Sequence, residues 1–313
     1  MGESGGGVPP TDRLLLVVNR AAGTAEDDAV AAALERLRAG ADVAVAATAD
    51  AADLDDVVAA RNGRRLVVLG GDGSVHAVVR ALDRAGALDP AEPLGIIAAG
   101  TGNDLARALR LPLDPVEGAA TVLSGSPRPL DLLRDDDGGL VINAVHAGIG
   151  ARAGAAADRF KDTLGAAAYP LGAASAGVTS SGWALRVTID GRIATHPTSG
   201  WTADGSSPVL MLGVCNGSSI GGGAPLAPDA LPDDGLADVV ISTATGPVAR
   251  VAFAAALVTG RHVERDDVFV VRGREITLSG GPLDLDADGE IERDVQSRTW
   301  RVQPAAWSVL VPN

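Results

Sequence analysis

The sequence predicts an α/β N-terminal domain built on a parallel sheet, followed by a mostly β C-terminal domain. Three observations support this fold class. The chain has 313 residues, which is enough for two domains of about 150 residues each. Up to about residue 109, apolar runs of strand length alternate with apolar residues at helical spacing. Beyond about residue 130 the apolar runs are shorter, and Asp-Gly and Gly-Gly turn sequences become frequent.

The elements of the first half follow one another in regular order. Strands are expected at 14–18, 43–48, 66–69 and 94–98. Helices are expected over 30–37, 54–58 and 75–82, with a fourth beginning at 105. Thr24 precedes three acidic residues, which is typical of a helix N-cap and first turn, and Gly40 ends that helix. Such alternation implies parallel strands, whose ligands bind at the carboxyl ends of the strands.

The second half carries hairpin and turn signals. Asp190-Gly191 lies between two apolar runs, 185–189 and 193–195, and predicts a β-hairpin. Further turns are expected at Asp137-Gly138-Gly139, Asp234-Gly235 and Gly280-Gly281. One helix is expected within this half, over 248–257.

Composition excludes several classes of protein. Apolar residues make up 46% of the chain and charged residues 21%, which excludes a disordered chain. A net charge of −14 argues against a general nucleic-acid binder and against attraction to an anionic membrane by overall charge. The single cysteine, Cys215, excludes a disulfide framework and is expected to be a buried apolar residue.

The termini and apolar stretches predict a cytoplasmic protein. Residues 1–11 are rich in Gly and Pro and are expected to be a disordered tail without a secretory signal. The uncharged stretch 164–185 is rich in small residues and interrupted by Pro170, so it is not expected to span a membrane.

The first chemical signal is Gly70-Gly71-Asp72-Gly73-Ser74, which joins the third strand to a helix. Glycines let the backbone approach a ligand, and the start of a helix favours phosphate. Asp72 fits such a loop only if a divalent cation lies between the carboxylate and the phosphates. The alternative is an ordinary Gly-rich turn in which Asp72 caps the helix.

Two further loops strengthen the phosphate interpretation. Gly100-Thr101-Gly102-Asn103-Asp104 again joins a strand to a helix, and Asn19 to Thr24 follows the first strand. Together the loops predict a nucleotide phosphate site at one edge of the sheet. The Asn19 to Thr24 loop is neither a Walker A loop nor the dinucleotide-binding fingerprint.

These loops resemble those of the diacylglycerol kinase catalytic-domain family, in its bacterial lipid kinase branch, which is related to sphingosine kinases and more distantly to NAD kinases. The resemblance also extends over segments of the second half: 143–150, 216–223, 227–230, 233–235 and Asp288-Gly289-Glu290. It therefore covers nearly the whole chain.

The resemblance implies an ATP- and Mg²⁺-dependent kinase that phosphorylates a lipid hydroxyl, that of diacylglycerol or a similar lipid, in the cleft between the two domains. It implies a Rossmann-like, NAD-kinase-like nucleotide-binding domain and a β-sandwich lipid-substrate domain. The expected boundaries are 12–130 with 300–313 for the first domain, to which the last strand near 307–311 returns, and 131–299 for the second. It further implies a lipid substrate at the inner face of the cell membrane, reached by transient peripheral contact, and dimers are common among relatives. The acidic net charge predicts no nucleic-acid partner.

The resemblance also assigns roles to residues. Asp72 would organise Mg²⁺ and the ATP phosphates. The residues expected to line the nucleotide are Asn19, Gly23, Thr48, Gly70, Gly71, Gly73, Ser74, Gly100, Thr101 and Asn103. Glu290 would be the general base, with Asp288 near the metal, although in sphingosine kinases the carboxylate of the first Gly-rich loop takes the role of base. Asp234 would help to hold a structural Mg²⁺.

Several alternatives stay open at this point. Asp288-Gly289-Glu290 could be a simple hairpin turn, and Asp233-Asp234 a solvent-facing turn, because Leu231 stands where relatives have another metal ligand. His76 is expected to be a surface residue at the start of its helix. The alternative functions are a kinase of a soluble hydroxyl compound such as NAD, and a non-catalytic nucleotide-binding regulator. The stretches 164–185 and 248–257 are the candidates for membrane contact, unless both belong to the core.

Overall fold

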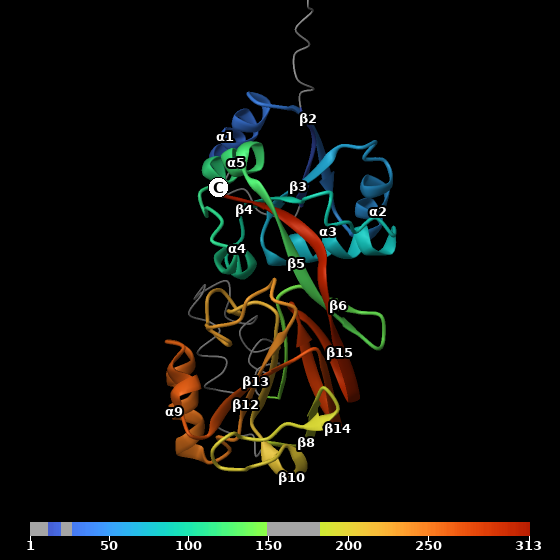
Figure 1. Cartoon of the computed structure of the whole chain (residues 1–313). Coiled ribbons are helices and arrows are strands. Elements are labelled where there is room, and N and C mark those ends of the chain that lie inside the picture. The colour runs from blue at the N-terminus through green and yellow to red at the C-terminus, as the bar shows by residue number, and fades with distance from the viewer. Residues whose placement is uncertain (1–11, 20–26, 149–181) are drawn as a thin grey trace, which may run out of the picture. The chain divides into compact units, whose positions relative to one another are not determined.

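A computed structural model describes residues 12–19, 27–148 and 182–313 (Figure 1). The described chain forms two compact units. Unit 1 contains the residues up to Gly100, together with 110–128 and 308–313. Unit 2 contains 101–109 and 129–307. The expected tail at 1–11, Gly23, Thr24 and most of the uncharged stretch 164–185 lie outside the described residues.

Unit 1 is built on a four-stranded parallel sheet in the order β2-β1-β3-β4. Its strands are β1 (Arg13–Asn19), β2 (Asp42–Thr48), β3 (Arg65–Gly70) and β4 (Gly95–Ala98). Its helices are α1 (Asp27–Arg38), α2 (Ala51–Ala59), α3 (Asp72–Arg84) and α5 (Pro115–Ser124). The parallel α/β fold predicted for the first half is therefore confirmed, as are the four strands.

Helices cover both faces of this sheet, as Figure 1 shows, with α1 and α5 on one side and α2 and α3 on the other. Leu14 and Leu16 of β1 face the first pair of helices, where Leu37 of α1 and Val122 of α5 complete one core cluster. The apolar spacing seen in the sequence is thus the inward face of each helix.

The fourth predicted helix is only one turn long. It is α4 (Asp104–Ala108), and α5, which the sequence did not predict, follows after a break. Residues 101–109 group with unit 2, although the sequence placed them in the first domain. The reason is physical: the Asp104 carboxylate is bound by a loop of unit 2, as described below.

Unit 2 is mostly antiparallel β-structure, as predicted. Its strands are β5 (Ser126–Asp135), β6 (Leu140–Val141), β7 (Ala144–Gly148), β8 (Trp183–Ile189), β9 (Arg192–Ile193), β10 (Asp204–Val209), β11 (Met211–Cys215), β12 (Ala237–Ser242), β13 (Val268–Gly273), β14 (Glu275–Ala287) and β15 (Glu290–Val311). Among its described residues the helices are α4, α9 (Pro247–Leu257) and the short 3₁₀ helix η3 (Arg261–Glu264). The central path of the sheet runs β13-β12-β11-β7-β14-β15-β5-β6. The helix predicted over 248–257 is confirmed.

The end of β15 belongs to unit 1. The Leu310 N–H donates to the Leu94 carbonyl at 3.0 Å, and the Leu94 N–H donates to the Ser308 carbonyl at 2.9 Å. Val309 pairs with Leu94 in parallel, just before β4. The last residues of the chain therefore extend the first unit's sheet region, while residues 300–307 stay with unit 2.

The turn predictions have mixed outcomes. The Asp190-Gly191 hairpin is confirmed, because Ile189 pairs with Arg192 and both turn residues have positive φ. The turn predicted at Gly280-Gly281 is wrong: both glycines lie inside β14, at an irregularity in its pairing with β15. A Cβ at Gly281 would overlap the Val295 carbonyl oxygen, so glycine here allows two backbones to approach.

Among the helices that the structure describes, none has the length and apolar content that crossing a bilayer requires.

Candidate functional site

The carboxyl ends of the unit 1 strands gather the first group of predicted site residues. Asn19 ends β1 in register with Thr48, the last residue of β2. Gly70 ends β3 in register with Ala98 of β4, and the Ala99 N–H donates to the Gly70 carbonyl at 3.0 Å. The parallel sheet thus brings the carboxyl ends of these strands to one edge, with the Gly70–Ser74 loop following β3 there, while residues 20–24 of the first loop lie outside the described residues.

The Gly70–Ser74 loop passes directly into α3. Gly71 is the N-cap, with extended backbone and no side-chain cap, and Asp72 is the first helical residue. The alternative in which Asp72 caps the helix is therefore wrong. A helix start without a side-chain cap leaves its positive end available to an anion, which suits a phosphate group.

Glycine stands at positions 70 and 73 of this loop for different reasons. A Cβ at Gly70 would lie 2.5 Å from the Ser74 Oγ, so Gly70 is required by the fold itself. A Cβ at Gly73 would meet nothing within 4 Å, and Gly73 is exposed. Packing therefore does not explain Gly73, whereas a ligand that approaches the backbone from this open side would.

His76 is buried, and the prediction of a surface histidine is wrong. Its exposed fraction is 4%, because it lies on the inner side of α3 with Val75 and Val79. His76 is thus part of the packing of unit 1 behind the loop.

The second Gly-rich loop is divided between the units. Gly100 belongs to unit 1, whereas Thr101 and Asn103 belong to unit 2. Thr101 is exposed, and Asn103 is buried with a φ of 55°, a left-handed conformation that asparagine tolerates. This conformation directs the chain into α4.

Asp104 holds this loop within unit 2. Its carboxylate accepts hydrogen bonds from the Ser219 hydroxyl at 2.8 Å and from the backbone N–H groups of Gly222 and Gly223 at 2.8 and 2.7 Å. Asp104 is 5% exposed. Sequence reasoning did not count Asp104 among the site residues, because nothing in the sequence connects it with glycines more than 100 positions away.

The Asp288-Gly289 sequence forms a tight hairpin turn between β14 and β15. Ala287 pairs with Glu290, and the two turn residues have φ values of 49° and 91°. The motif therefore adopts hairpin geometry, which leaves the role predicted for Glu290 untested. Glu290, the predicted base, is the first residue of β15 and is exposed.

Backbone groups bind the Asp288 carboxylate. Its Oδ2 accepts from the Ile142 N–H at 2.7 Å, and its Oδ1 accepts from the N–H groups of Asn143 and Ala144 at 3.1 and 3.0 Å. The Asp288 N–H donates in return to the Ala144 carbonyl at 3.0 Å. Since both oxygens accept hydrogen bonds from backbone N–H groups, Asp288 fixes the conformation of the turn that precedes Glu290. Its expected place near a metal stays a prediction.

Within unit 2, hydrogen bonds connect the Asp288-Gly289 turn with the second Gly-rich loop. Asn143, which is held by Asp288, donates from its Nδ2 to the Ser219 carbonyl at 2.8 Å. Ser219 in turn donates from its hydroxyl to Asp104. Asn216 braces the same segment by donating to the Ile142 carbonyl at 2.9 Å. Hydrogen bonds through Asn143 and Ser219 therefore link Asp288 with Asp104, which spacing alone could not predict. Glu290 and Asn103 are close neighbours of these two carboxylates in the chain.

Asp286 and His146 lie next to the Asp288-Gly289 turn. Asp286 accepts from the Gly289 N–H at 2.9 Å, and its Oδ2 lies 3.8 Å from the His146 Nε2. Burial lowers the pKa of His146, and the nearby Asp286 carboxylate only partly opposes this effect. His146 is therefore neutral at pH 7.

Asp234 is occupied by protein partners. Its Oδ2 forms an ion pair with Arg272, and its Oδ1 accepts from the Leu236 N–H at 3.0 Å. The buried Asp131 carboxylate holds the adjacent Gly235 N–H at 2.6 Å. The turn is therefore stabilised by a guanidinium and by backbone groups, and a metal at Asp234 would have to displace Arg272.

Within the described ranges, no three His, Cys, Asp or Glu side chains gather as a metal centre would require. Mg²⁺ in kinases commonly uses one or two carboxylates together with the substrate phosphates. Asp72 at the start of α3, beside the open side of Gly73, is a donor of that type. The Gly70–Ser74 loop thus fits a nucleotide phosphate with its cation.

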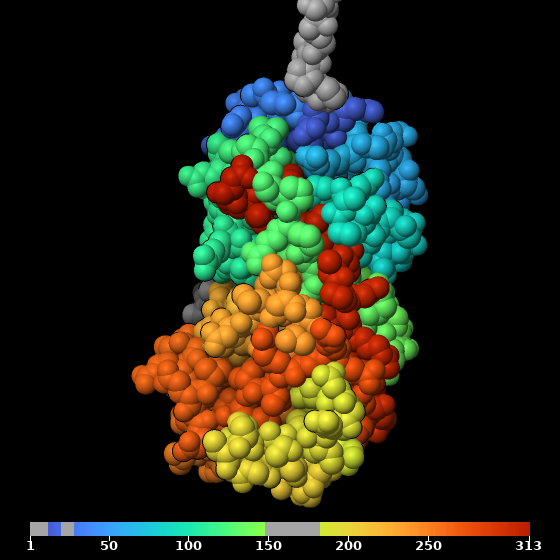
Figure 2. Space-filling model, viewed as in Figure 1, coloured from blue at the N-terminus to red at the C-terminus, as the bar shows by residue number. Residues whose placement is uncertain are grey.

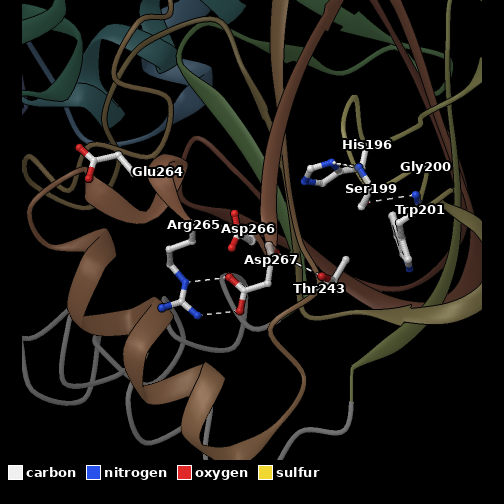
Figure 3. Close-up of a pocket in the computed structure, with 9 residues that line it drawn as sticks. All are labelled: His196, Ser199, Gly200, Trp201, Thr243, Glu264, Arg265, Asp266 and Asp267. Carbon is white, nitrogen blue, oxygen red and sulfur yellow. Dashed lines mark hydrogen bonds and ion pairs between the residues drawn. The ribbon is translucent and has the colours of Figure 1, made fainter.

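A pocket of about 850 Å³ lies elsewhere in unit 2, between the 196–201 loop and the segment after η3 (Figure 3). Arg265 and Asp267 line the pocket and form a bidentate ion pair, with nitrogen–oxygen distances of 2.7 and 2.6 Å. The pocket contains none of the predicted site residues. The charges of Arg265 and Asp267 neutralise each other, and His196, Glu264 and Asp266 also line the pocket.

Two family models match the chain, one in each half. Residues 13–134 match the family described as diacylglycerol kinase catalytic domain. Residues 143–311 match the family described as YegS C-terminal NAD kinase beta sandwich-like domain.

Individual relatives extend over most of the chain. A protein of Xanthomonas oryzae pv. oryzae (strain MAFF 311018) named "Probable lipid kinase YegS-like" is 34% identical over 261 residues, covering 79% of both chains. A protein of the same name from Pseudomonas aeruginosa PAO1 is 33% identical over 312 residues, covering 96% of this chain and 95% of its own.

Solved structures share the fold. A diacylglycerol kinase from Bacillus anthracis str. Sterne has a TM-score of 0.68 at 18% identity, covering 96% of this chain and 97% of that one. A second crystal structure from the same organism has a TM-score of 0.75 at 20% identity, covering 96% and 98%. The two matched domains and the relatives show that the chain belongs to the diacylglycerol kinase catalytic-domain family, among its YegS-like members.

Proposed function

We propose that this protein is a Mg²⁺-dependent lipid kinase that transfers the γ-phosphoryl group of ATP to a lipid hydroxyl, with diacylglycerol as the first acceptor to test. Family membership supports a kinase, and the names of the relatives support a lipid acceptor. The observation that carries the proposal is the Gly70–Ser74 loop, where an uncapped helix start, an open glycine and a carboxylate coincide.

The residues of unit 1 are proposed to hold the nucleotide. The N-terminus of α3 and the backbone around Gly73 would bind the phosphates, with Asn19 and Thr48 at the same sheet edge. Asp72 would hold Mg²⁺ on the phosphates. When bound, the cation offsets charge that develops on the transferred phosphoryl group.

The residues of unit 2 are proposed to act on the acceptor. A lipid hydroxyl is a weak nucleophile, so a carboxylate within hydrogen-bond reach must accept its proton. Glu290 is the candidate, because it is exposed and follows a turn whose geometry Asp288 fixes. The hydroxyl oxygen forms a bond to the γ-phosphorus, the bond from that phosphorus to the bridging oxygen breaks, the proton goes to Glu290, and ADP leaves.

The test is a phosphorylation assay with γ-labelled ATP and a panel of acceptors: diacylglycerol, monoacylglycerol, sphingosine, phosphatidylglycerol and NAD. The proposal expects label in one of the lipids that depends on Mg²⁺. Label in NAD alone would show a kinase of a soluble hydroxyl. Tight ATP binding without transfer to any acceptor would favour a nucleotide-binding regulator.

A further inference from the structure

Helix α9 presents apolar residues on two opposite sides. Phe253 and Leu257 are buried at 2% and 5% exposure and pack into a core cluster of unit 2. On the other side Val248 and Val251 are exposed at 82% and 61%, and Val258, directly after the helix, is exposed at 50%. These three valines are among the few large apolar side chains exposed in the part of the chain that the structure describes.

The exposed residues form one continuous line. Positions 248, 251, 255 and 258 are separated by three, four and three residues, which places them above one another on a helix surface. Ala255 is exposed as well, and Val258 keeps helical backbone angles. We name Val248, Val251, Ala255 and Val258 the valine stripe. In Figure 2, α9 lies in orange at the edge of unit 2, where its outer side borders solvent.

An apolar outer face needs a physical explanation. A helix that is apolar all round is normally buried in a core or in a membrane. Contiguous exposed apolar side chains on other proteins mark surfaces that bind a partner or a lipid layer. With eleven residues, α9 is too short to span a bilayer but long enough to lie along its surface.

The charge around the stripe distinguishes a lipid surface from other partners. The chain has a net charge of −14, yet no Asp or Glu occurs from Val239 to Val263. The only charged residues in that stretch are Arg250 and Arg261. Arg261 is exposed and pairs with Glu264 at 3.2 Å on the surface, an interaction of little strength in water. An acid-free, weakly basic apolar strip suits an anionic lipid surface, which would repel the rest of the chain.

We propose that the valine stripe docks α9 onto an anionic lipid bilayer, with the helix axis in the plane of the interface. The inference deepens the proposed function, since unit 2 also carries Glu290, and it rests on that function for the identity of the membrane as the source of substrate. Docking brings the unit that acts on the acceptor to the layer in which the acceptor lies.

The experiment measures sedimentation of the full chain with vesicles of phosphatidylcholine and phosphatidylglycerol, without ATP. The variant is Val248→Asp/Val251→Asp, which should lower the vesicle partition coefficient by at least about tenfold, equivalent to about 1.4 kcal/mol. Val248→Ser/Val251→Ser should lower it less, because it removes apolar contact without adding repulsion. The matched control is Leu113→Asp, a partly exposed leucine of unit 1, which should leave binding unchanged.

Each other outcome overturns the docking proposal. Unchanged vesicle binding of the Val248→Asp/Val251→Asp variant, or absence of binding by the parent, means that the stripe is not a lipid contact. A clear fall in the Tm of the Val248→Asp/Val251→Asp variant means that other residues of the same chain cover the valine stripe. If the same variant has a different oligomeric state from the parent in the absence of lipid, a second copy of the chain covers the valine stripe.

Because binding is measured without catalysis, its failure is distinct from failure of the proposed kinase activity. If the lipid assay is negative while the Asp variant loses binding, only the kinase proposal fails. In an active enzyme, the variant should lose phosphorylation of vesicle-borne diacylglycerol but keep that of a water-soluble short-chain analogue.

Discussion

The carboxylates of Asp104 and Asp288 hold backbone groups in place. Asp288 binds three consecutive N–H groups, and Asp104 binds a hydroxyl and two glycine N–H groups. A carboxylate accepts such bonds more strongly than a neutral oxygen does. These residues therefore fix the geometry of the loops that carry Thr101, Asn103 and Glu290.

Replacing Asp288 by Ala should destabilise the fold. Three buried or partly buried N–H groups would lose their acceptor, and we expect the free energy of unfolding to fall by about 2–4 kcal/mol. The matched control is Asp190→Ala, which removes the carboxylate of the other Asp-Gly hairpin, where it accepts two N–H groups at an exposed site. That control should cost about 1–2 kcal/mol. Urea unfolding measures both variants. Equal losses of unfolding free energy would contradict the role of the Asp288 carboxylate in holding three backbone N–H groups.

Replacing Glu290 by Gln keeps the size of the side chain but removes its capacity to take a proton at neutral pH. If Glu290 is the base, lipid phosphorylation should fall by about 10²–10⁴-fold. ATP affinity should stay nearly unchanged, because the phosphates are assigned to the Gly70–Ser74 loop. Initial rates at saturating Mg²⁺ decide the point: normal turnover of this variant would leave Asp72 as the base, as in the sphingosine kinase assignment.

At the scale of elements, the passage from β3 to α3 combines two different constraints. Gly70 has no room for a side chain because Ser74 lies against it, whereas Gly73 faces open space. The first glycine serves the fold and the second is free to serve a ligand. This difference can be tested with alanine.

Gly73→Ala should separate stability from nucleotide binding. Gly73 lies in the first turn of α3 without a positive φ, so alanine should keep stability or raise it by up to about 1 kcal/mol. The added methyl group would occupy the side assigned to the phosphates, and we expect ATP affinity to fall at least tenfold. The comparison is Gly70→Ala, which should lower stability by about 1–3 kcal/mol. Unchanged ATP affinity of Gly73→Ala by calorimetry would contradict the phosphate assignment.

At the scale of the whole molecule, buried neutral histidines make stability depend on pH. His262 is fully buried, and its Nε2 lies 2.8 Å from the Leu226 carbonyl, to which a neutral ring donates. Burial lowers the pKa of His262, as it does for His146. As pH falls below the ordinary histidine pKa of about 6.5, the unfolded chain binds protons that the native state does not, so stability decreases.

His262→Gln should reduce this dependence. Glutamine can still donate to Leu226 but does not titrate, so the decline in unfolding free energy between pH 7.5 and 5.5 should become less steep. Each histidine contributes at most about 1.4 kcal/mol per pH unit. Burial raises the pKa of Asp238, and this shift opposes the loss of stability as pH falls. It is the same in the parent and in His262→Gln, so it does not affect the comparison. Urea unfolding at three pH values measures the slopes, and identical slopes would contradict the buried neutral state of His262.

The sequence was informative where function depends on local structure. Strand ends, the Gly70–Ser74 loop and the α9 helix follow from periodicity and turn chemistry, which act over a few residues. Cys215 is buried as expected, and burial raises the pKa of its thiol. The backbone partners of Asp104 and Asp288 could not be predicted, because they lie more than 100 positions away in the chain. Gly280-Gly281 was misjudged because close approach of two strands, rather than a turn, requires glycine there.

The most direct test of the central claim is transfer of labelled phosphoryl from ATP to diacylglycerol in mixed micelles, measured for the parent and for Asp72→Asn. The account predicts Mg²⁺-dependent labelling of the lipid by the parent, and a loss of at least about 10²-fold in turnover with an unchanged Tm for the variant, because the carboxylate that organises the cation is gone. Equal Mg²⁺-dependent labelling by both proteins would contradict the role given to the Gly70–Ser74 loop.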